Sequence, residues 1–266
     1  KDVLLNSLNK VSKALSSKNL IPVLSGIKFN LTNNGLFLSA RDNDISIESF
    51  IDKKDLEEIN EVGSTVIQGK YVLEIIRKLE GRIVSFELLD NIKVLISCGK
   101  SEFNLNCMDA NEFPNLNLEE QKEPIILRKT EFKNLINKTS FAVSTQETRP
   151  ILTGINFVIK EDKLECISTD SYRLAKKSVT LQNKVNEEVN VIIPGKNLIE
   201  LTKIIEEEDD DIQMHIFSNK VLFKFDNTLF QTRVLSGTFP DVNRLIPDSF
   251  EVEIKVNASE FYNVID

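Results

Sequence analysis

Histidine is almost absent from this chain of 266 residues, which contains only His215. One histidine excludes a metal site built on two histidines, and any Ser-His-Asp or Cys-His relay would have to pass through it. His215 lies in the strand-like stretch IQMHIF (212–217), where we interpret it as a structural or surface residue. We therefore expect neither a histidine-based metal site nor a catalytic relay through this residue.

Cysteines and long apolar runs are also scarce. Cys98, Cys107 and Cys166 are odd in number and lack the C-x-x-C spacing, which favours free thiols over a disulfide framework or a zinc site. No apolar run approaches the roughly 18 residues that a membrane span needs. The first ten residues carry no apolar export signal. We expect a cytoplasmic protein without a membrane partner.

The nine glycines do not form a nucleotide-binding pattern. None of them is followed by a second glycine two residues later, which excludes G-x-G-x-x-G. The sequence Gly99-Lys100-Ser101 has Val94 where a P-loop requires glycine. We therefore expect no nucleotide cofactor, and no cofactor of any other kind.

The sequence instead contains an internal repeat. LIPVLSGIKF (20–29) returns as RPILTGINF (149–157) at an offset of 128 residues, and Gly-Lys at 69–70 returns at 195–196. A third copy begins near the end, where Glu-Phe at 260–261 repeats the pair at 131–132. We predict a first domain at 1–119 that lacks its N-terminal strand, a second at 120–249, and the start of a truncated third at 250–266.

Each unit is predicted to combine two helices with antiparallel strands, which is an α+β fold. Apolar spacing predicts helices at about 3–15, 70–79, 130–143 and 196–205. Alternating and apolar stretches predict strands at 29–30, 36–39, 84–88, 93–97, 102–106, 124–127, 155–159, 163–167, 212–217, 221–225, 229–234 and 252–256. The turn Asn33-Asn34-Gly35 predicts a hairpin.

The charge is distributed unevenly. The net charge is -8, but segments 2–18, 70–82, 128–140 and 196–205 contain 13 Lys and Arg against 5 Asp and Glu. If the repeats place their helices on one side, the basic residues form a surface for a polyanion backbone, read without sequence preference. The alternative is that amphipathic helices commonly expose lysines. The candidates are Lys10, Lys13, Lys18, Lys70, Arg77, Lys78, Lys133, Lys138, Lys196 and Lys203.

Two acidic features suggest other chemistry. The run EEEDDD (206–211) lacks the glycine and the ligand spacing of an EF-hand loop, so we interpret it as a solvated turn. Asp42 and Asp170 are equivalent in the repeat. They could belong to a metal-dependent phosphoester hydrolase, but each more readily accepts hydrogen bonds from backbone donors in a turn.

Four long motifs in the same order resemble the beta subunit of bacterial DNA polymerase III, the sliding clamp family. They are RPILTGINF (149–157), TDSYRLA (169–175), PGK (194–196) and FPDVNRLIP (239–247). The resemblance implies three similar domains per subunit and two subunits joined head to tail into a ring around duplex DNA. It implies no catalysis. It also implies partners that carry clamp-binding peptides, among them the polymerase III alpha subunit and the clamp loader.

The resemblance assigns residues to three sites. The partner-peptide pocket would use Leu152, Thr169, Ser171, Tyr172, Arg173, Leu174, Pro240, Arg244 and Leu245. The family often has Gly-His where this chain has Ser171-Tyr172, so the groove is expected to be narrower or reshaped. DNA contacts would involve Lys18, Gln146, Arg149 and Lys196, and the dimer interface would involve Lys70, Phe103 and Leu105.

Two alternatives to a clamp remain at this stage. One is an enzyme of duplicated domains, recognised by metal-dependent turnover of a nucleotide or nucleic acid. The other is a degenerate clamp relative that serves only as a protein scaffold. For the chain as it stands we expect a monomer, with the homodimer formed only at full length.

Overall fold

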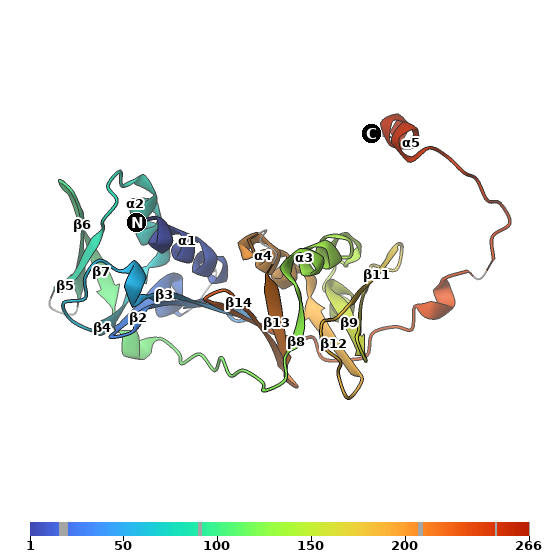
Figure 1. Ribbon diagram of the computed structural model, residues 1–266, viewed down its shortest axis with the longest axis horizontal. Coiled ribbons are helices and arrows are strands. Elements are labelled where there is room, and N and C mark those ends of the chain that lie inside the picture. Colours follow the sequence, from blue (N-terminus) through green and yellow to red (C-terminus); the bar gives the residue numbers. More distant parts are fainter. Residues whose placement is uncertain (16–20, 90–91, 207–209, 248, 266) are drawn as a thin grey trace.

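The computed structural model describes residues 1–15, 21–89, 92–206, 210–247 and 249–265. Two α+β domains lie side by side, and a C-terminal segment extends away from them (Figure 1). The first domain contains α1 (Asp2–Val11), β1 (Gly26–Thr32), β2 (Gly35–Arg41), β3 (Ile45–Asp52), β4 (Gly63–Gln68), α2 (Gly69–Lys78), β5 (Ser85–Leu89), β6 (Lys93–Cys98) and β7 (Ser101–Met108).

The second domain repeats this order with one strand added at its start. It contains β8 (Ile125–Arg128), α3 (Lys129–Asn137), β9 (Gly154–Lys160), β10 (Lys163–Thr169), β11 (Leu174–Thr180), β12 (Val189–Pro194), α4 (Gly195–Ile204), β13 (Asp211–Ile216), β14 (Lys220–Phe225) and β15 (Thr228–Arg233). The isolated helix α5 (Ala258–Ile265) follows. The predicted duplication and the α+β class are confirmed.

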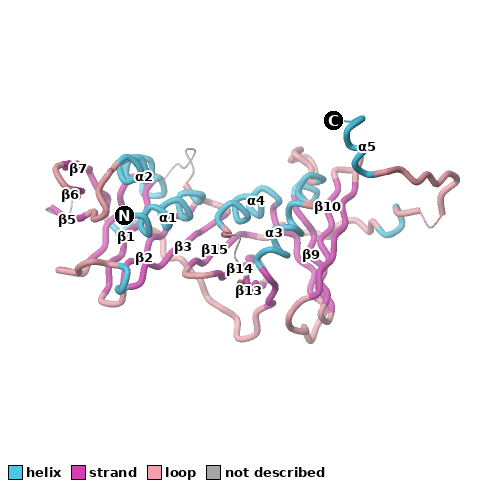
Figure 2. Tube along the Cα trace, turned by 45° about the horizontal axis from the view of Figure 1, so that its top comes forward, coloured by secondary structure: helices cyan, strands magenta, loops and turns pink. Residues whose placement is uncertain are grey.

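One sheet runs through both domains. Its strand order is β5-β6-β7-β4-β1-β2-β3-β15-β14-β13-β8, and a second sheet has the order β11-β10-β9-β12. Helices α1, α2, α3 and α4 all lie on the same side of the strands (Figures 1 and 2). The helices thus share one face of the two-domain body, which is the arrangement that a common basic surface requires.

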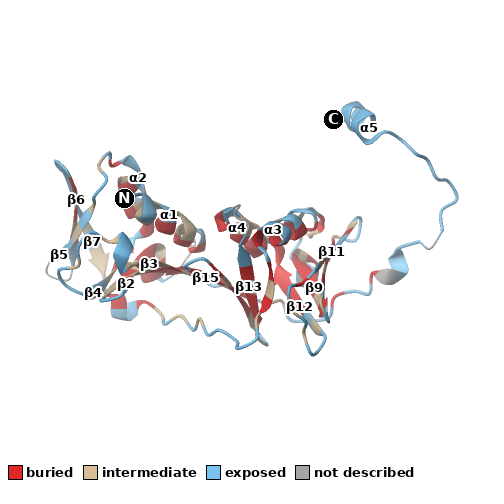
Figure 3. Cartoon of the chain, in the orientation of Figure 1, coloured by how far each residue is buried: buried red, intermediate tan, exposed pale blue. Residues whose placement is uncertain are grey.

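The apolar face of each helix forms the core with the strands below it. In α2, Val72 and Ile76 are fully buried, and in α3 Phe132 and Ile136 are fully buried. Red, buried positions in Figure 3 accordingly follow the contact between helices and sheets. Apolar side chains spaced three or four residues apart meet on one helix face, which is why these segments are helical in this context.

Several predicted boundaries were wrong. α1 and α3 end at Val11 and Asn137, so the predicted helices were too long. A short 3-10 turn directly follows α1, and another begins at Ser140 after α3. β3, β4, β11 and β12 were not predicted. The predicted strand at 252–256 does not form, and Val252 and Ile254 are 79% and 75% exposed. A strand needs a neighbour to satisfy its backbone, and this segment has none among the described residues.

The described residues contain no helix long and apolar enough to cross a membrane. They also contain no group of three or more His, Cys, Asp or Glu side chains placed to hold a metal ion. Of the acidic run at 206–211, residues 207–209 lie outside the described residues.

Candidate functional site

The contact between the two domains is a strand pair. β3 of the first domain lies antiparallel to β15 of the second, with Ile45 opposite Thr232 and Ser49 opposite Thr228. Phe230 faces Ile47 in this register, and both side chains are completely buried. We call this contact the junction. It joins the domains through backbone hydrogen bonds as well as apolar packing.

Ion pairs and polar contacts flank the junction. The Lys196 ammonium lies 2.8 Å from the Asp44 carboxylate, and this contact raises the pKa of Lys196. A second polar contact between the domains involves Glu206, which accepts a hydrogen bond from Asn6 at 2.9 Å and pairs with Lys10 at 3.2 Å. Lys10 and Lys196, both predicted to contact DNA, therefore also bind acidic partners in the other domain.

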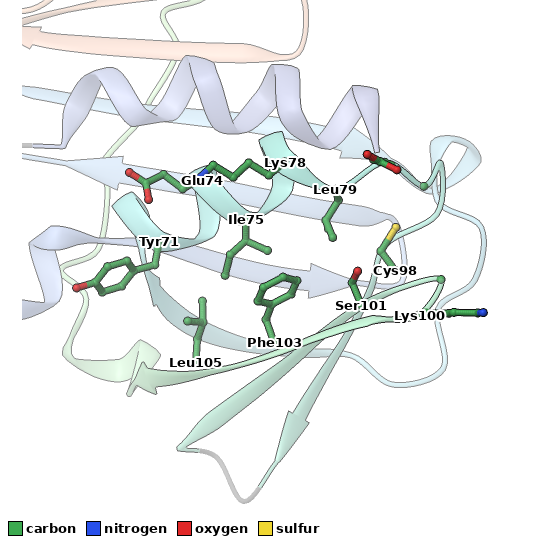
Figure 4. Close-up of a pocket in the computed structure, with 13 residues that line it drawn as sticks. Tyr71, Glu74, Ile75, Lys78, Leu79, Cys98, Lys100, Ser101, Phe103 and Leu105 are labelled. Carbon is green, nitrogen blue, oxygen red and sulfur yellow. The ribbon is translucent and has the colours of Figure 1, made fainter.

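The first domain carries an exposed counterpart of this junction. β7 matches β15 in the repeat, and Phe103 occupies the place of Phe230. Phe103 is 39% exposed, because its strand pairs with β6 and only briefly with β4. A hollow of about 630 Å³ lies between α2 and β7 (Figure 4). We call it the α2–β7 hollow; its lining includes Tyr71, Ile75, Leu79, Phe103 and Leu105.

The α2 side chains of this hollow were not predicted, although Phe103 and Leu105 were assigned to an interface. Tyr71, Ile75 and Leu79 recur at intervals of four, so they form a second apolar stripe beside the buried Val72 and Ile76. That double stripe was the signal available in the sequence. The equivalent residues of α4 are Asn197, Leu201 and Ile205, and all three are buried.

The hollow and the junction correspond in their contacts as well. In the second domain, Asn197 on α4 donates a hydrogen bond to Thr232 on β15 at 2.9 Å. Their counterparts in the first domain are Tyr71 and Leu105, which both line the α2–β7 hollow. The helix and the strand are therefore in contact beside the junction, whereas their counterparts in the first domain line an open hollow.

The repeated aspartates stabilise turns. Asp170 accepts the backbone N–H groups of Tyr172 and Arg173 at 3.0 Å, and its carboxylate also binds the Arg173 side chain at 2.9 Å. The backbone hydrogen bonds, the Tyr172 bond foremost, lower the pKa of Asp170. Asp42 accepts the N–H groups of Asp44 and Ile45 in the same way. Both carboxylates are thus occupied by their own turns, as the sequence interpretation predicted.

The predicted partner pocket has a well-packed apolar floor. Leu152 is 5% exposed and belongs to a cluster with Ile167, Ile192, Phe239 and Val242, against which Leu174 packs. Nearby, the Thr169 hydroxyl donates to the Arg173 carbonyl at 2.8 Å and accepts the Ser171 N–H at 3.1 Å. The motifs that supply this floor are 149–157, 169–175 and 239–247, so the structure brings them together.

The rim of this pocket is exposed. Tyr172 is 95% exposed, and Ser171 has a φ of 78°, a left-handed conformation that favours glycine. The Arg173 guanidinium lies 5.8 Å from the centre of the Phe141 ring. Three further predicted pocket residues are exposed in the segment that follows β15, namely Pro240, Arg244 and Leu245. The Phe141 contact was not anticipated from the sequence.

The basic candidates differ in how far they remain accessible. Arg77 bonds Asn9, Lys133 donates to the Ile205 carbonyl, and Lys203 pairs with Glu200. The remaining described candidates are exposed, and they are Lys13, Lys70, Lys78, Lys138, Gln146 and Arg149. Lys18 lies outside the described residues.

Comparison with known proteins follows the same domain division. The family profile described as "DNA polymerase III beta subunit, N-terminal domain" matches residues 1–117, and the one described as "central domain" matches residues 126–241. The beta sliding clamps of Staphylococcus epidermidis and Staphylococcus aureus are 41% identical over 270 residues, covering 100% of this chain and 71% of theirs. This chain belongs to the DNA polymerase III beta subunit family.

Solved clamp structures agree. The DNA polymerase sliding clamp of Bacillus subtilis superimposes with a TM-score of 0.95 at 42% identity, covering 99% of this chain and 70% of that one. The beta chain of Streptococcus pneumoniae gives a TM-score of 0.89 at 34% identity, covering 94% and 67%. The function is accordingly that of a DNA sliding clamp, a non-catalytic processivity factor, which replaces the alternative of a metal-dependent hydrolase.

Proposed function

We propose that this clamp closes into a head-to-tail ring in which every contact between domains repeats the junction of β3 with β15. The observation that carries the proposal is the α2–β7 hollow. It is the exposed equivalent of the α4–β15 surface that the junction covers. Its occupant would be the third domain of a second subunit, presenting a strand and turn like β3 and Asp42–Ile45.

The same logic applies at the other end of the two-domain body. β11 corresponds to β3, and among the described residues it pairs only with β10. Its free edge would receive the last strand of the chain's own third domain. Lys70, the counterpart of Lys196, would then pair with an acidic turn residue of the second subunit, as Lys196 does with Asp44. Domain boundaries near 119 and 249 fit this division.

Oligomeric state tests the ring. By light scattering, the 266-residue chain is expected to be a monomer, because it offers the hollow without a complete third domain. A version extended through a third domain is expected to dimerise, and Phe103→Asp should abolish the dimer by placing a charge in the hollow. Ile83→Asp is the matched control, since Ile83 is 57% exposed and does not line the hollow. Equal loss in both variants would refute the assignment.

DNA would pass the side that carries α1, α2, α3 and α4. Exposed Lys13, Lys138 and Arg149 supply cations for phosphates, and contact with the backbone alone allows sliding. Lys13→Ala and Lys138→Ala should each weaken DNA binding and reduce the slope of log K against log salt by about 0.9 for each phosphate that is no longer neutralised. Lys163→Ala, on an exposed hairpin residue, is the control. Unchanged slopes in both lysine variants would contradict the proposed face.

Partner proteins would dock a short peptide on the cluster around Leu152 and Leu174. An apolar floor with an exposed arginine at its edge suits a peptide with hydrophobic anchors and polar flanks. A labelled peptide with a glutamine followed by hydrophobic residues should bind saturably by anisotropy. Binding should be lost in the double variant Arg173→Ala, Leu174→Ala and kept in Lys177→Ala on the same strand. Equal binding by the double variant would refute the pocket.

A further inference from the structure

The segment that joins the two domains is held against the large sheet by a set of polar contacts. We call residues 114–124 the strap; they run on the side of the sheet opposite the helices (Figures 1 and 2). Lys220 donates to the Asn117 carbonyl at 2.6 Å, and Lys224 pairs with Glu120 at 2.7 Å. The Gln121 side chain bonds both backbone groups of Ile216. The strap is thus anchored on β13 and β14.

His215 also holds the strap, and it is the contact whose side chain can change its protonation near neutral pH. The residue is 1% exposed, and its Nδ1 accepts the backbone N–H of Gln121 at 2.8 Å. A ring nitrogen that accepts must be unprotonated, so the proton of the neutral ring is on Nε2. Nε2 is buried without a hydrogen-bond partner among the described residues.

Protonation is incompatible with this arrangement. A second proton would turn Nδ1 into a donor facing the Gln121 N–H, so a hydrogen bond would become a repulsive contact. The charged groups that face the ring are Glu120 on the strap and Lys224 on β14, and they already pair with each other. Glu120 alone would favour an imidazolium, but Lys224 opposes it and burial of the ring has the larger effect. A buried charge without a partner is strongly unfavourable.

We propose that His215 is an acid-sensitive latch, and that protonation of its imidazole releases the strap around Gln121 from β13 while the β3–β15 junction stays formed. Burial lowers the pKa of His215 from its ordinary value, and the Lys224 charge lowers it further while Glu120 opposes the shift. The released strap exposes the ring and restores the ordinary pKa of about 6.5.

The sign of the pH dependence follows. Because the docked state has the lower pKa, docking is strongest above about pH 6.5 and weakens as the pH falls toward the docked-state pKa. Between the two pKa values the docking equilibrium should fall by up to about tenfold per pH unit. Below both values it should become constant again.

Two measurements on the 266-residue chain test the latch. Because His215 is the only histidine, one pair of ¹⁵N ring resonances reports its titration and tautomer without overlap. We expect the Nε2–H tautomer at pH 8 and a pKa below 6.5. Hydrogen exchange at the Gln121 amide, corrected for the intrinsic rate, should lose protection through the same pH range.

Variants separate the latch from general loosening. In His215→Asn the side-chain oxygen can replace the Nδ1 acceptor without titrating, so the protection of Gln121 should become independent of pH. In Gln121→Ala the strap should exchange faster at every pH but keep the His215-linked pH dependence. An Nδ1–H tautomer in the wild-type chain, or Gln121 protection that does not change as His215 titrates, would overturn the proposal whatever the variants do.

Discussion

β15 and β7 occupy the same place in the two repeats, yet one is covered and the other is exposed. Phe230 on β15 is completely buried against β3, whereas its counterpart Phe103 on β7 is 39% exposed beside the α2–β7 hollow. The helices that cover these strands show the same difference, since Leu201 of α4 is buried and its counterpart Ile75 of α2 is only half-buried. In the ring that we propose, the open α2–β7 hollow would be covered by a neighbouring domain that presents a strand like β3.

Truncating the two phenylalanines should give the largest contrast. Phe230→Ala removes a fully buried ring and should lower the free energy of unfolding by about 3–5 kcal/mol, because it leaves a cavity at the junction. Phe103→Ala should lower it by less than about 1 kcal/mol, since its partly exposed ring already contacts water. Urea unfolding of the 266-residue chain measures both. Similar losses for the two variants would show that β7 is not an open counterpart of β15.

The turns that precede β3 and β11 offer a second, smaller contrast. Ser171 adopts a φ of 78°, while Asn43 at the equivalent position has no positive φ. Ser171→Gly should raise the free energy of unfolding by about 0.5–1 kcal/mol through relief of left-handed strain, and Asn43→Gly should lower it by up to about 1 kcal/mol. Thermal unfolding at one pH would test the opposite signs. A destabilised Ser171→Gly would contradict the interpretation of this turn as strained.

The smallest effect is expected from the flanking ion pair. Lys196→Met removes the ion pair between Lys196 and Asp44, whose side chains are 73% and 41% exposed. The substitution should lower the free energy of unfolding by no more than about 0.5 kcal/mol at low salt. The cost should vanish in molar salt, where exposed pairs are screened. Lys70→Met, at the equivalent place beside the hollow, should change nothing in the 266-residue chain. Equal costs at both positions would remove the distinction between the closed and open surfaces.

Much of the fold could be predicted because the sequence repeats. Gly69 and Gly195 begin equivalent helices, and the aspartates at 42 and 170 accept hydrogen bonds in equivalent turns. An element predicted in one unit was therefore supported by the matching residues of the other. β11 (LAKKSVT) was missed because its polar and apolar residues alternate only weakly, and β3 (ISIESFID) because its alternation stops at Ser49. β3 also has two buried serines, Ser46 and Ser49, so its burial does not follow the polarity of its residues.

The site could be predicted less completely, for a physical reason. The motifs predicted Leu152 and Leu174 as pocket residues, and the two pack in one apolar cluster. The contact between Arg173 and Phe141 joins segments 32 residues apart and depends on tertiary packing. The ion pairs of Lys10 and Lys196 likewise arise only when the domains meet. A basic residue counted from the sequence can therefore be bound to an acid in the folded chain.

The β3–β15 pair also determines how the two domains would come apart under load. Five residue pairs align along this strand contact. A force along the strand axis would load all the hydrogen bonds of this ladder together, whereas a force across it would open them one at a time from an end. The mechanical strength of the junction therefore depends on direction. The two domains should resist a force along the strands far better than a force that separates the strands from one end.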